Sequence, residues 1–400
     1  MRILPKFSSR KSIFLYLILG KLLMLPIIIL LFNSYDSRAN ALFLYPDMVR
    51  YEDAGNILNI FNFESIFNLK IDTYNREWVS NVGYMSIVFF VKRIISIEYL
   101  RIFVFSLISL ITISISQSII LQIIFREKKL SNSKLKLFSI LISILNFYIL
   151  IYSFKTSTDV FGCLGIALLI DAYIKSKNLK FKKNFFVKWV LVFLCLCLFR
   201  NNLILFLPFF FLTDIPSQVF KEISYLKNFY KFVVLVVIGL FLILNFSQIA
   251  GNLEMYLHQQ KWYGIKNLNI ISNNYFSIDY LFNLAKFISS KIIFLLGARE
   301  AVGMSNNWFV NTSEGISFSK NVVFTNIIPA IILININLFG IISIFKSFSR
   351  KFINSFVFSL IPLIPIISFA AHHRYFLPYA IITSGCLPFL FEKKINKLIN

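Results

Sequence analysis

Long apolar segments separated by short basic ones dominate the hydrophobic pattern of this chain. Runs of about 18 or more apolar residues recur from end to end, and each can form a helix that crosses a bilayer. The pattern predicts an all-α polytopic membrane protein with about ten spans, counting a broken segment at 186–213 as a pair of half-helices. The other spans are expected at about 12–33, 100–125, 136–154, 158–174, 230–248, 322–345, 353–370 and 375–391.

The composition supports a membrane protein and assigns its orientation. Hydrophobic residues make up 58% of the chain and charged residues only 15%, whereas a soluble domain carries about 25% charged residues. The net charge of +23 comes from Lys and Arg clusters between the apolar runs, and such clusters stay on the cytoplasmic side of a membrane. We therefore expect a bacterial plasma (inner) membrane protein with both termini in the cytoplasm. Because no basic groove is interleaved with aromatic residues, nucleic acid is not an expected partner.

The remaining segments are expected to belong to the same integral-membrane domain, which spans residues 1–400. Residues 34–99 form a first external loop, and residues 250–320 form a second external segment. Within the first loop, 82–97 is apolar but short and contains two basic residues, so it predicts an amphipathic helix in the outer interface. The piece at 281–297 is either re-entrant or spanning. As one straight helix, 186–213 would place Arg200 near mid-bilayer at a cost of about 2.5–3.5 kcal/mol, which favours the broken form.

An acidic island, "YPDMVRYEDAGNIL" at 45–58, follows the first span. If this stretch is helical, Asp47 and Tyr51 share one face, and Glu52 and Asp53 point away from it. A carboxylate beside a pocket is suited to accept a proton from a hydroxyl group, which is the task of a general base. The alternative is structural, since an acid directly after Pro46 also suits the start of a helix.

Three further polar motifs are expected on the outer face with this island. They are "KTSTD" (155–159), "FRNN" (199–202) and "AHHRYFLP" (371–378). The planar guanidinium groups of Arg200 and Arg374 match the geometry of a phosphate group. Two arginines facing a carboxylate at this membrane face indicate a phosphorylated lipid with a reactive sugar carbon, and His373 can add a hydrogen bond.

The order of these motifs resembles the C-type (GT-C) integral-membrane glycosyltransferases, including protein O-mannosyltransferases and aminoarabinose transferases. Members of that superfamily combine an early D-x3-Y-x2-A loop, a polar turn with Thr and an acid, a basic residue in a broken segment, and an RYxLP-like helix start. The matching positions are Asp47, Tyr51, Ala54, Thr158, Asp159, Arg200, Pro208, Arg374, Tyr375, Leu377 and Pro378. The stretch "REWVSNVGYMSIVFF" departs from the proline-rich pattern of many relatives.

The resemblance implies inverting sugar transfer from a polyprenyl-phosphate-linked donor to a glycan or lipid-linked acceptor. Asp47 would be the catalytic base, and Arg200 and Arg374 would stabilise charge on the leaving phosphate. The substrate-binding residues would be Tyr51, Asp159, Arg200, His373, Arg374 and Tyr375. No tight DxD motif is present, so neither a divalent metal nor another cofactor is expected.

Two other functions remain open at this point. The first is a repeat-unit polymerase of exopolysaccharide or O-antigen, in which the same arginines would bind a diphosphate-linked donor. The second is a flippase or transporter of lipid-linked oligosaccharide. Transport predicts polar residues along the middle of several helices and symmetry between halves, and the sequence pattern indicates neither.

Overall fold

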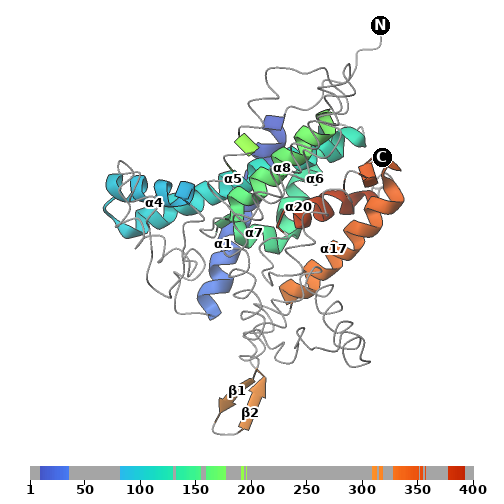
Figure 1. The fold of residues 1–400 in the computed structure, drawn as a ribbon. Helices are drawn as coiled ribbons and strands as arrows, with labels where there is room; N and C mark the ends of the chain where they lie inside the picture. The colour runs from blue at the N-terminus through green and yellow to red at the C-terminus, as the bar shows by residue number, and fades with distance from the viewer. Residues whose placement is uncertain are drawn as a thin grey trace, which may run out of the picture.

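Helix α5 (Glu98–Glu127) is the longest helix among the described residues, and several of the other described helices pack against it (Figure 1). The computed structural model describes residues 10–35, 82–128, 132–154, 159–176, 191–192, 195, 309–312, 315–318, 328–350, 352–354, 356 and 377–391. Its other helices are α1 (Arg10–Tyr35), α4 (Val82–Ile94), α6 (Asn132–Leu145), α7 (Phe147–Phe154), α8 (Asp159–Ser176), α17 (Ile328–Ser347), α20 (Leu377–Cys386) and the 3-10 helix η7 (Leu387–Phe391).

A short antiparallel hairpin is the exception to this helical architecture. Strand β1 (Phe309–Thr312) pairs with β2 (Gly315–Phe318), with Phe309 opposite Phe318. In Figure 1 the hairpin is drawn at the bottom, away from the helices. The hairpin was not predicted, because 250–320 was interpreted only as an external segment. Apart from this hairpin, the regular structure of the described residues is helical, as expected for an all-α chain.

The predicted second span is confirmed as a helix of membrane-spanning dimensions. Its segment Leu100–Glu127 has 28 residues and is apolar enough to cross a bilayer. At about 1.5 Å per residue it is about 42 Å long, and hydrocarbon cores are about 30 Å thick. Among the described residues it is the one helix that meets both criteria. Most of 186–213, all of 230–248 and 281–297, and most of 353–370 lie outside the described residues.

Two predicted spans differ from the structure in their interior. The span expected at 136–154 is divided into α6 and α7 at the buried Asn146. Its Oδ1 accepts a hydrogen bond from the backbone N–H of Ile149 at 3.1 Å, and its Nδ2 donates to the carbonyl of Ala380 at 3.3 Å. Asn146 therefore starts a new helix and ties it to α20. The last span changes from α20 into η7 near Pro388, which has no N–H for an α-helical bond.

Side-chain contacts give the relative directions of the helices. Lys21 and Arg10 of α1 contact Ser114 and Ser118 of α5, so α1 runs antiparallel to α5. At the other end of the chain, Gly385 approaches Leu121 of α5 and the following residues of η7 contact the end of α5, so α20 runs parallel to α5. These directions agree with the alternation predicted for the corresponding spans.

Helices α17 and α20 pack in parallel through small and polar residues. Asn337 accepts a hydrogen bond from the Thr383 hydroxyl at 2.7 Å, and the Ser343 hydroxyl donates to the carbonyl of Cys386 at 2.6 Å. Between them lies Gly340, where a Cβ atom would stand 2.4 Å from the carbonyl oxygen of Thr383. Close backbone approach at a small residue, flanked by interhelical hydrogen bonds, is typical of helices packed in membranes.

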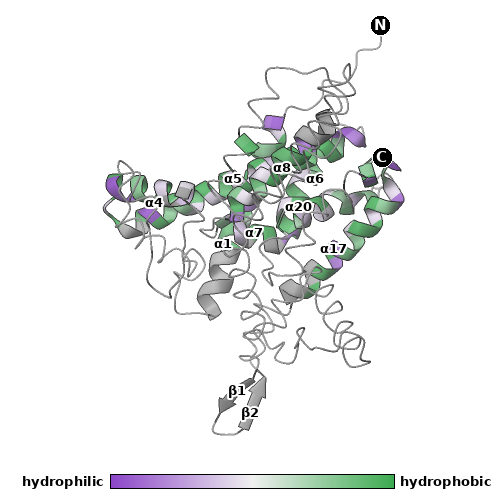
Figure 2. Ribbon diagram, in the orientation of Figure 1, coloured by the Kyte–Doolittle hydropathy of each residue, from purple (hydrophilic) through white to green (hydrophobic). Residues whose placement is uncertain are grey.

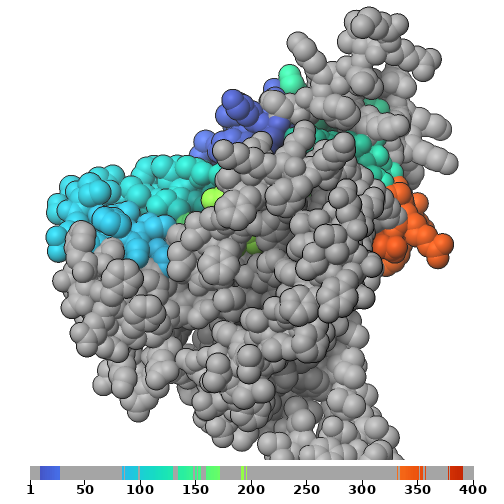
Figure 3. Space-filling model, turned by 45° about the horizontal axis from the view of Figure 1, so that its top comes forward, coloured from blue at the N-terminus to red at the C-terminus, as the bar shows by residue number. Residues whose placement is uncertain are grey.

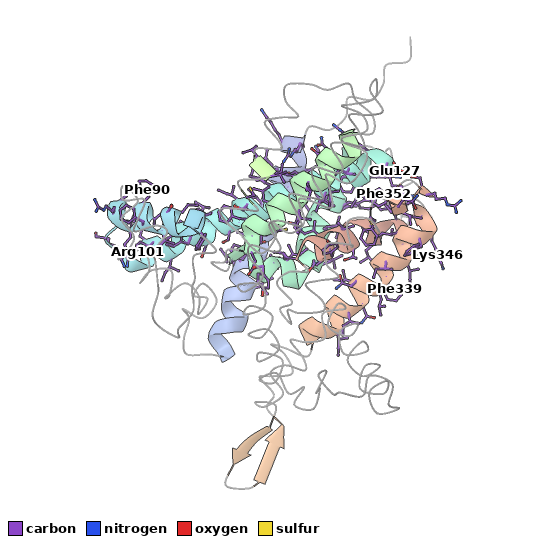
Figure 4. All side chains as sticks on the ribbon, in the orientation of Figure 1. Phe90, Arg101, Glu127, Phe339, Lys346 and Phe352 are labelled. Carbon is purple, nitrogen blue, oxygen red and sulfur yellow. The ribbon has the colours of Figure 1, made fainter. Side chains whose placement is uncertain are left out.

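An aromatic junction closes the end of the bundle at which α5, α17 and η7 finish. The ammonium of Lys128 donates to the carbonyl of Ser347 and lies over the rings of Phe348 and Phe389, 4.8 and 5.6 Å from their centroids. We call this the basic end of the bundle, and Figure 4 shows Glu127 and Lys346 there. Positive side chains at helix ends here are Arg10, Lys11, Arg126, Lys128, Lys134, Lys136, Lys346 and Arg350.

The described helices expose large apolar side chains and also bury polar ones within a mainly apolar core, which differs from a soluble helical bundle. Large apolar side chains point outward, for example Leu137, Leu141 and Leu145, which recur every fourth residue along α6. Figure 2 shows that hydrophobic residues make up much of the described helices. Several polar side chains are buried instead, among them Lys21, Ser114, Ser116, Gln117, Ser139, Asn146, Asp171 and Ser343. Outward apolar bands of this kind indicate an apolar environment around the bundle.

Candidate functional site

Asp159 is the predicted site residue that the structure describes. It is the first residue of α8, as expected for an acid in the turn before that helix, where a negative charge is favoured by the helix dipole. Its side chain is only 4% exposed, so it is enclosed rather than displayed on a loop. Two residues further on, Phe161 packs against Tyr84 of α4 with ring centroids 6.0 Å apart. The other predicted residues, Asp47, Tyr51, Arg200, His373, Arg374 and Tyr375, lie outside the described residues.

A polar cluster in the interior of the bundle lies close to Asp159. Lys21 of α1 is fully buried, and its ammonium donates a hydrogen bond to the hydroxyl of Ser114 at 2.8 Å. The thiol of Cys163, one turn after Asp159 on α8, is within electrostatic range of both Lys21 and Asp159. Three helices therefore contribute a cation, a carboxylate and a hydroxyl to one region.

The polar stretch "TISISQS" at 112–118 supplies the α5 side of this interior. Ser116 donates to the carbonyl of Thr112 at 2.8 Å, which satisfies its hydroxyl within the helix. The amide of Gln117 is fully buried, and neither its oxygen nor its nitrogen has a hydrogen-bond partner among the described residues. Burying an amide is costly unless it is paired, so Gln117 is a polar group that packing alone does not explain.

A second, partly buried contact lies nearer the basic end. Arg10, which precedes the predicted first span, donates to the Ser118 hydroxyl at 3.4 Å. Burial lowers the pKa of Arg10, and the carboxylate of Asp171 acts in the opposite direction. Arg10, at the start of α1, interacts with Asp171, and Lys21, near its middle, interacts with Cys163. Since Asp171 follows Cys163 along α8, α8 runs antiparallel to α1.

These interior groups correct one conclusion drawn from the sequence. The transport alternative was disfavoured because the sequence indicated neither polar residues along the middle of several helices nor symmetry between the halves, and the structure bears on the first of these. The structure shows that Lys21 and Gln117 occupy that position on α1 and α5. The signal was available, since Lys21 is the one charged residue between positions 12 and 32 and an ionisable group within a span points to function.

The directions of the helices also relate the four sequence motifs to one another. Helix α1 ends, and α8 and α20 begin, at the end of the bundle opposite the basic end. We call this the motif end. The segment with Asp47 follows α1, Asp159 itself starts α8, and the segment with Arg374 precedes α20. Three of the four motifs are therefore adjacent in sequence to helix termini at one end of the bundle.

Replacing Ser114 by Ala is expected to lower the free energy of unfolding by about 1.5–3 kcal/mol, because the buried ammonium of Lys21 loses its hydroxyl acceptor. The matched control is Ser106→Ala, whose buried hydroxyl has no hydrogen-bond partner among the described residues. That change should be close to neutral. Unfolding in a denaturing detergent measures both, and equal losses would show that the contact between Lys21 and Ser114 contributes no stability.

Comparisons with known protein families, curated proteins and solved structures found no match to this chain. Among the described residues, no group of three His, Cys, Asp or Glu side chains is placed to hold a metal ion. The metal-free expectation stays a prediction, since it also concerns residues outside the described ranges.

Proposed function

We propose that this chain is an integral-membrane glycosyltransferase that transfers a sugar from a polyprenyl-phosphate-linked donor to a glycan or lipid-linked acceptor on the outer face of the membrane. The observation that carries the proposal is the placement of helix termini. The end of α1 and the starts of α8 and α20, which border the segments with Asp47, Asp159 and Arg374, lie at one end of a bundle with large apolar side chains on its surface.

Charge at the two ends of the bundle supports the orientation in this proposal. The basic end gathers Lys and Arg from α1, α5, α6 and α17, and such residues are retained on the cytoplasmic side. The motif end then faces outward, where a lipid-linked sugar donor is presented. Large apolar side chains face outward and polar groups are buried among the helices. This arrangement is compatible with the bilayer location that the reaction requires.

In the proposed reaction, Asp47 removes the proton from the acceptor hydroxyl as its oxygen bonds to the anomeric carbon of the sugar. The bond between that carbon and the phosphate oxygen breaks at the same time, with inversion of the carbon. Arg200 and Arg374 stabilise the negative charge on the departing phosphate. The remaining substrate-binding positions are Tyr51, Asp159, His373 and Tyr375.

A test of this function compares the surface glycans of cells with and without the chain by mass spectrometry. A transferase of this type predicts the loss of one sugar per glycan unit when the chain is absent, with restoration by the intact chain. A change in the number of repeat units with unchanged composition would instead indicate a polymerase. Accumulation of a complete lipid-linked unit inside the cell would indicate transport.

A transporter of an anionic lipid-linked glycan is a second candidate, favoured by the buried polar cluster. Lys21, Gln117 and Asp159 occupy the bundle interior between α1, α5 and α8, which is where transporters place polar groups that meet their substrate. The transferase proposal places substrates near the motif end and gives Lys21 no role. Loss of function in Lys21→Met, with folding retained, would therefore favour transport.

A further inference from the structure

Helix α4 and the first part of α5 form a helical hairpin that projects from the bundle. The base of the hairpin is held by Tyr84, whose ring lies 6.3 Å from that of Phe105 on α5 and 6.0 Å from that of Phe161 on α8. Figures 1 and 3 show the far part of this hairpin extending beyond the other described helices. We call the segment 89–103 at its tip the elbow.

The elbow has a defined backbone conformation. Arg101 of α5 donates hydrogen bonds to the carbonyls of Ile95 and Ser96, at 3.3 and 2.7 Å, in the turn that follows α4. Figure 4 shows Arg101 and Phe90 at this tip. Because the cation satisfies carbonyls at the end of a helix, it fixes the turn and the direction in which the neighbouring side chains point.

Apolar side chains at the elbow are among the most exposed in the described chain. Ile94 is 80% exposed and Phe103 is 61% exposed, and three further large apolar residues are exposed beside them. The three are Phe90, Ile97 and Leu100. Helix α4 has 13 residues and is about 20 Å long, which is too short to cross a hydrocarbon core of about 30 Å. Phe90 and Ile94 lie on this short helix, Ile97 lies in the turn after it, and Leu100 and Phe103 lie at the start of α5. The apolar surface therefore joins a helix too short to span with the first turns of the spanning helix.

Positive charge adjoins this apolar surface. Residues 82–103 contain three basic residues, Lys92, Arg93 and Arg101, and one acidic residue, Glu98. Arg93 is exposed, and its guanidinium lies over the ring of Phe89 at 4.9 Å from the centroid. A cation that extends along an apolar ring keeps its charge at the polar boundary while its stem lies on apolar surface. Exposed apolar residues beside basic ones match the two layers of a lipid headgroup region.

We propose that the elbow binds anionic, phosphate-bearing lipid at the bilayer surface, with Ile94, Ile97 and Phe103 in the acyl boundary and Lys92 and Arg93 at the phosphates. This inference goes beyond sugar transfer and does not depend on it. Its occupant is a membrane lipid, because a soluble phosphate would leave the exposed apolar residues in water. The position of the elbow also places a lipid-binding surface on the hairpin whose base contacts α8 next to Asp159.

The test uses the full chain in bilayers that contain equal amounts of phosphatidylcholine and phosphatidylglycerol. A bimane fluorophore is attached at Ile94→Cys after the four native cysteines are replaced by alanine, and either one lipid or the other is brominated. Brominated phosphatidylglycerol should quench at least about twofold more strongly, since each basic residue near an anionic surface favours binding roughly fivefold. Equal quenching by the two lipids, or quenching by neither, would overturn the proposal.

Two comparisons keep the result specific. In the double variant Lys92→Gln/Arg93→Gln, the two brominated lipids should quench equally. The double variant Lys346→Gln/Arg350→Gln loses the same charge at the basic end and should keep the stronger quenching by brominated phosphatidylglycerol. A preference that survives the first change or disappears with the second would contradict the assignment. For the unaltered elbow, raising the salt concentration should also reduce the preference, and a preference insensitive to salt would rule out recognition by charge. Neither readout requires glycosyltransferase activity.

Discussion

Replacing Asp47 by Asn is expected to abolish sugar transfer while the amount of folded chain stays unchanged. The amide keeps the size of the carboxylate but cannot accept the proton of the acceptor hydroxyl. Loss of general-base catalysis typically costs about 10²–10⁴-fold in rate, which is enough to remove the sugar from the surface glycan. The measurement is the mass spectrum of glycans from cells that contain only the variant, together with the quantity of chain in the membrane.

The same substitution at Asp53 is the matched control for Asp47→Asn. Both acids lie in the same island. If the island is helical, Asp53 points away from the face that Asp47 and Tyr51 share. Asp53→Asn should therefore leave the glycan intact. A normal glycan in Asp47→Asn would remove Asp47 from the mechanism, and equal losses in the two variants would point to an effect of the island's total charge.

Replacing Gly340 by Ala is expected to lower the free energy of unfolding by about 1–3 kcal/mol, the usual cost of an added group in a packed core. The new Cβ atom would stand 2.4 Å from the carbonyl oxygen and 2.7 Å from the carbonyl carbon of Thr383. Since these are backbone atoms, α17 must move away from α20. That movement also strains the hydrogen bonds from Thr383 to Asn337 and from Ser343 to Cys386.

Gly385→Ala, on the partner helix, separates backbone collision from the general effect of a methyl group. Its Cβ atom would meet only the ends of two side chains, Leu121 Cδ2 at 2.7 Å and Ile124 Cδ1 at 2.8 Å. Such ends can rotate away, so a smaller loss is expected than at Gly340. Thermal unfolding of both purified variants in detergent gives the comparison. A loss at Gly385 equal to or above that at Gly340 would contradict the described contact of α17 with α20.

Hydropathy predicted the helices whose ends are set by a change from apolar to polar residues. The first span was expected at 12–33 and the helix is Arg10–Tyr35, and the short run at 82–97 became the helix Val82–Ile94. The placement of α4 at the membrane interface stays a prediction. Its length, however, agrees with the interpretation that it does not cross the bilayer.

Features that depend on tertiary partners could not be predicted in the same way. Asn146 divides a predicted span because its side chain binds both the following turn and the carbonyl of Ala380, more than two hundred residues away in sequence. Hydropathy averaged over a window of sequence registers Asn146 only as one polar residue in an apolar run. Lys21 is recognisable in the sequence as the one charged residue of its span, but its acceptor, Ser114, lies on another helix and could not be predicted.

The candidate site was predicted only as a set of motifs, and the structure describes one of its residues. Asp159 is at a helix start as expected, but its burial depends on tertiary packing of α8, which lies against α5. The relative directions of α1, α8 and α20 were predicted from the alternation of basic loops. The contacts of α1 and α20 with α5, and the interactions of α8 with α1, agree with them. The positions of Asp47, Arg200 and Arg374 stay predictions.

Crosslinking between positions 47 and 374 tests the central claim most directly. Cysteines at both positions, in the chain with its native cysteines replaced by alanine, should react with a membrane-impermeant reagent from outside and join through a short bifunctional thiol reagent. A pair at positions 47 and 346 should not join, because Lys346 lies at the basic end of α17. Labelling of 47 and 374 from opposite sides of the membrane, or equal crosslinking of the two pairs, would contradict a shared site at the motif end.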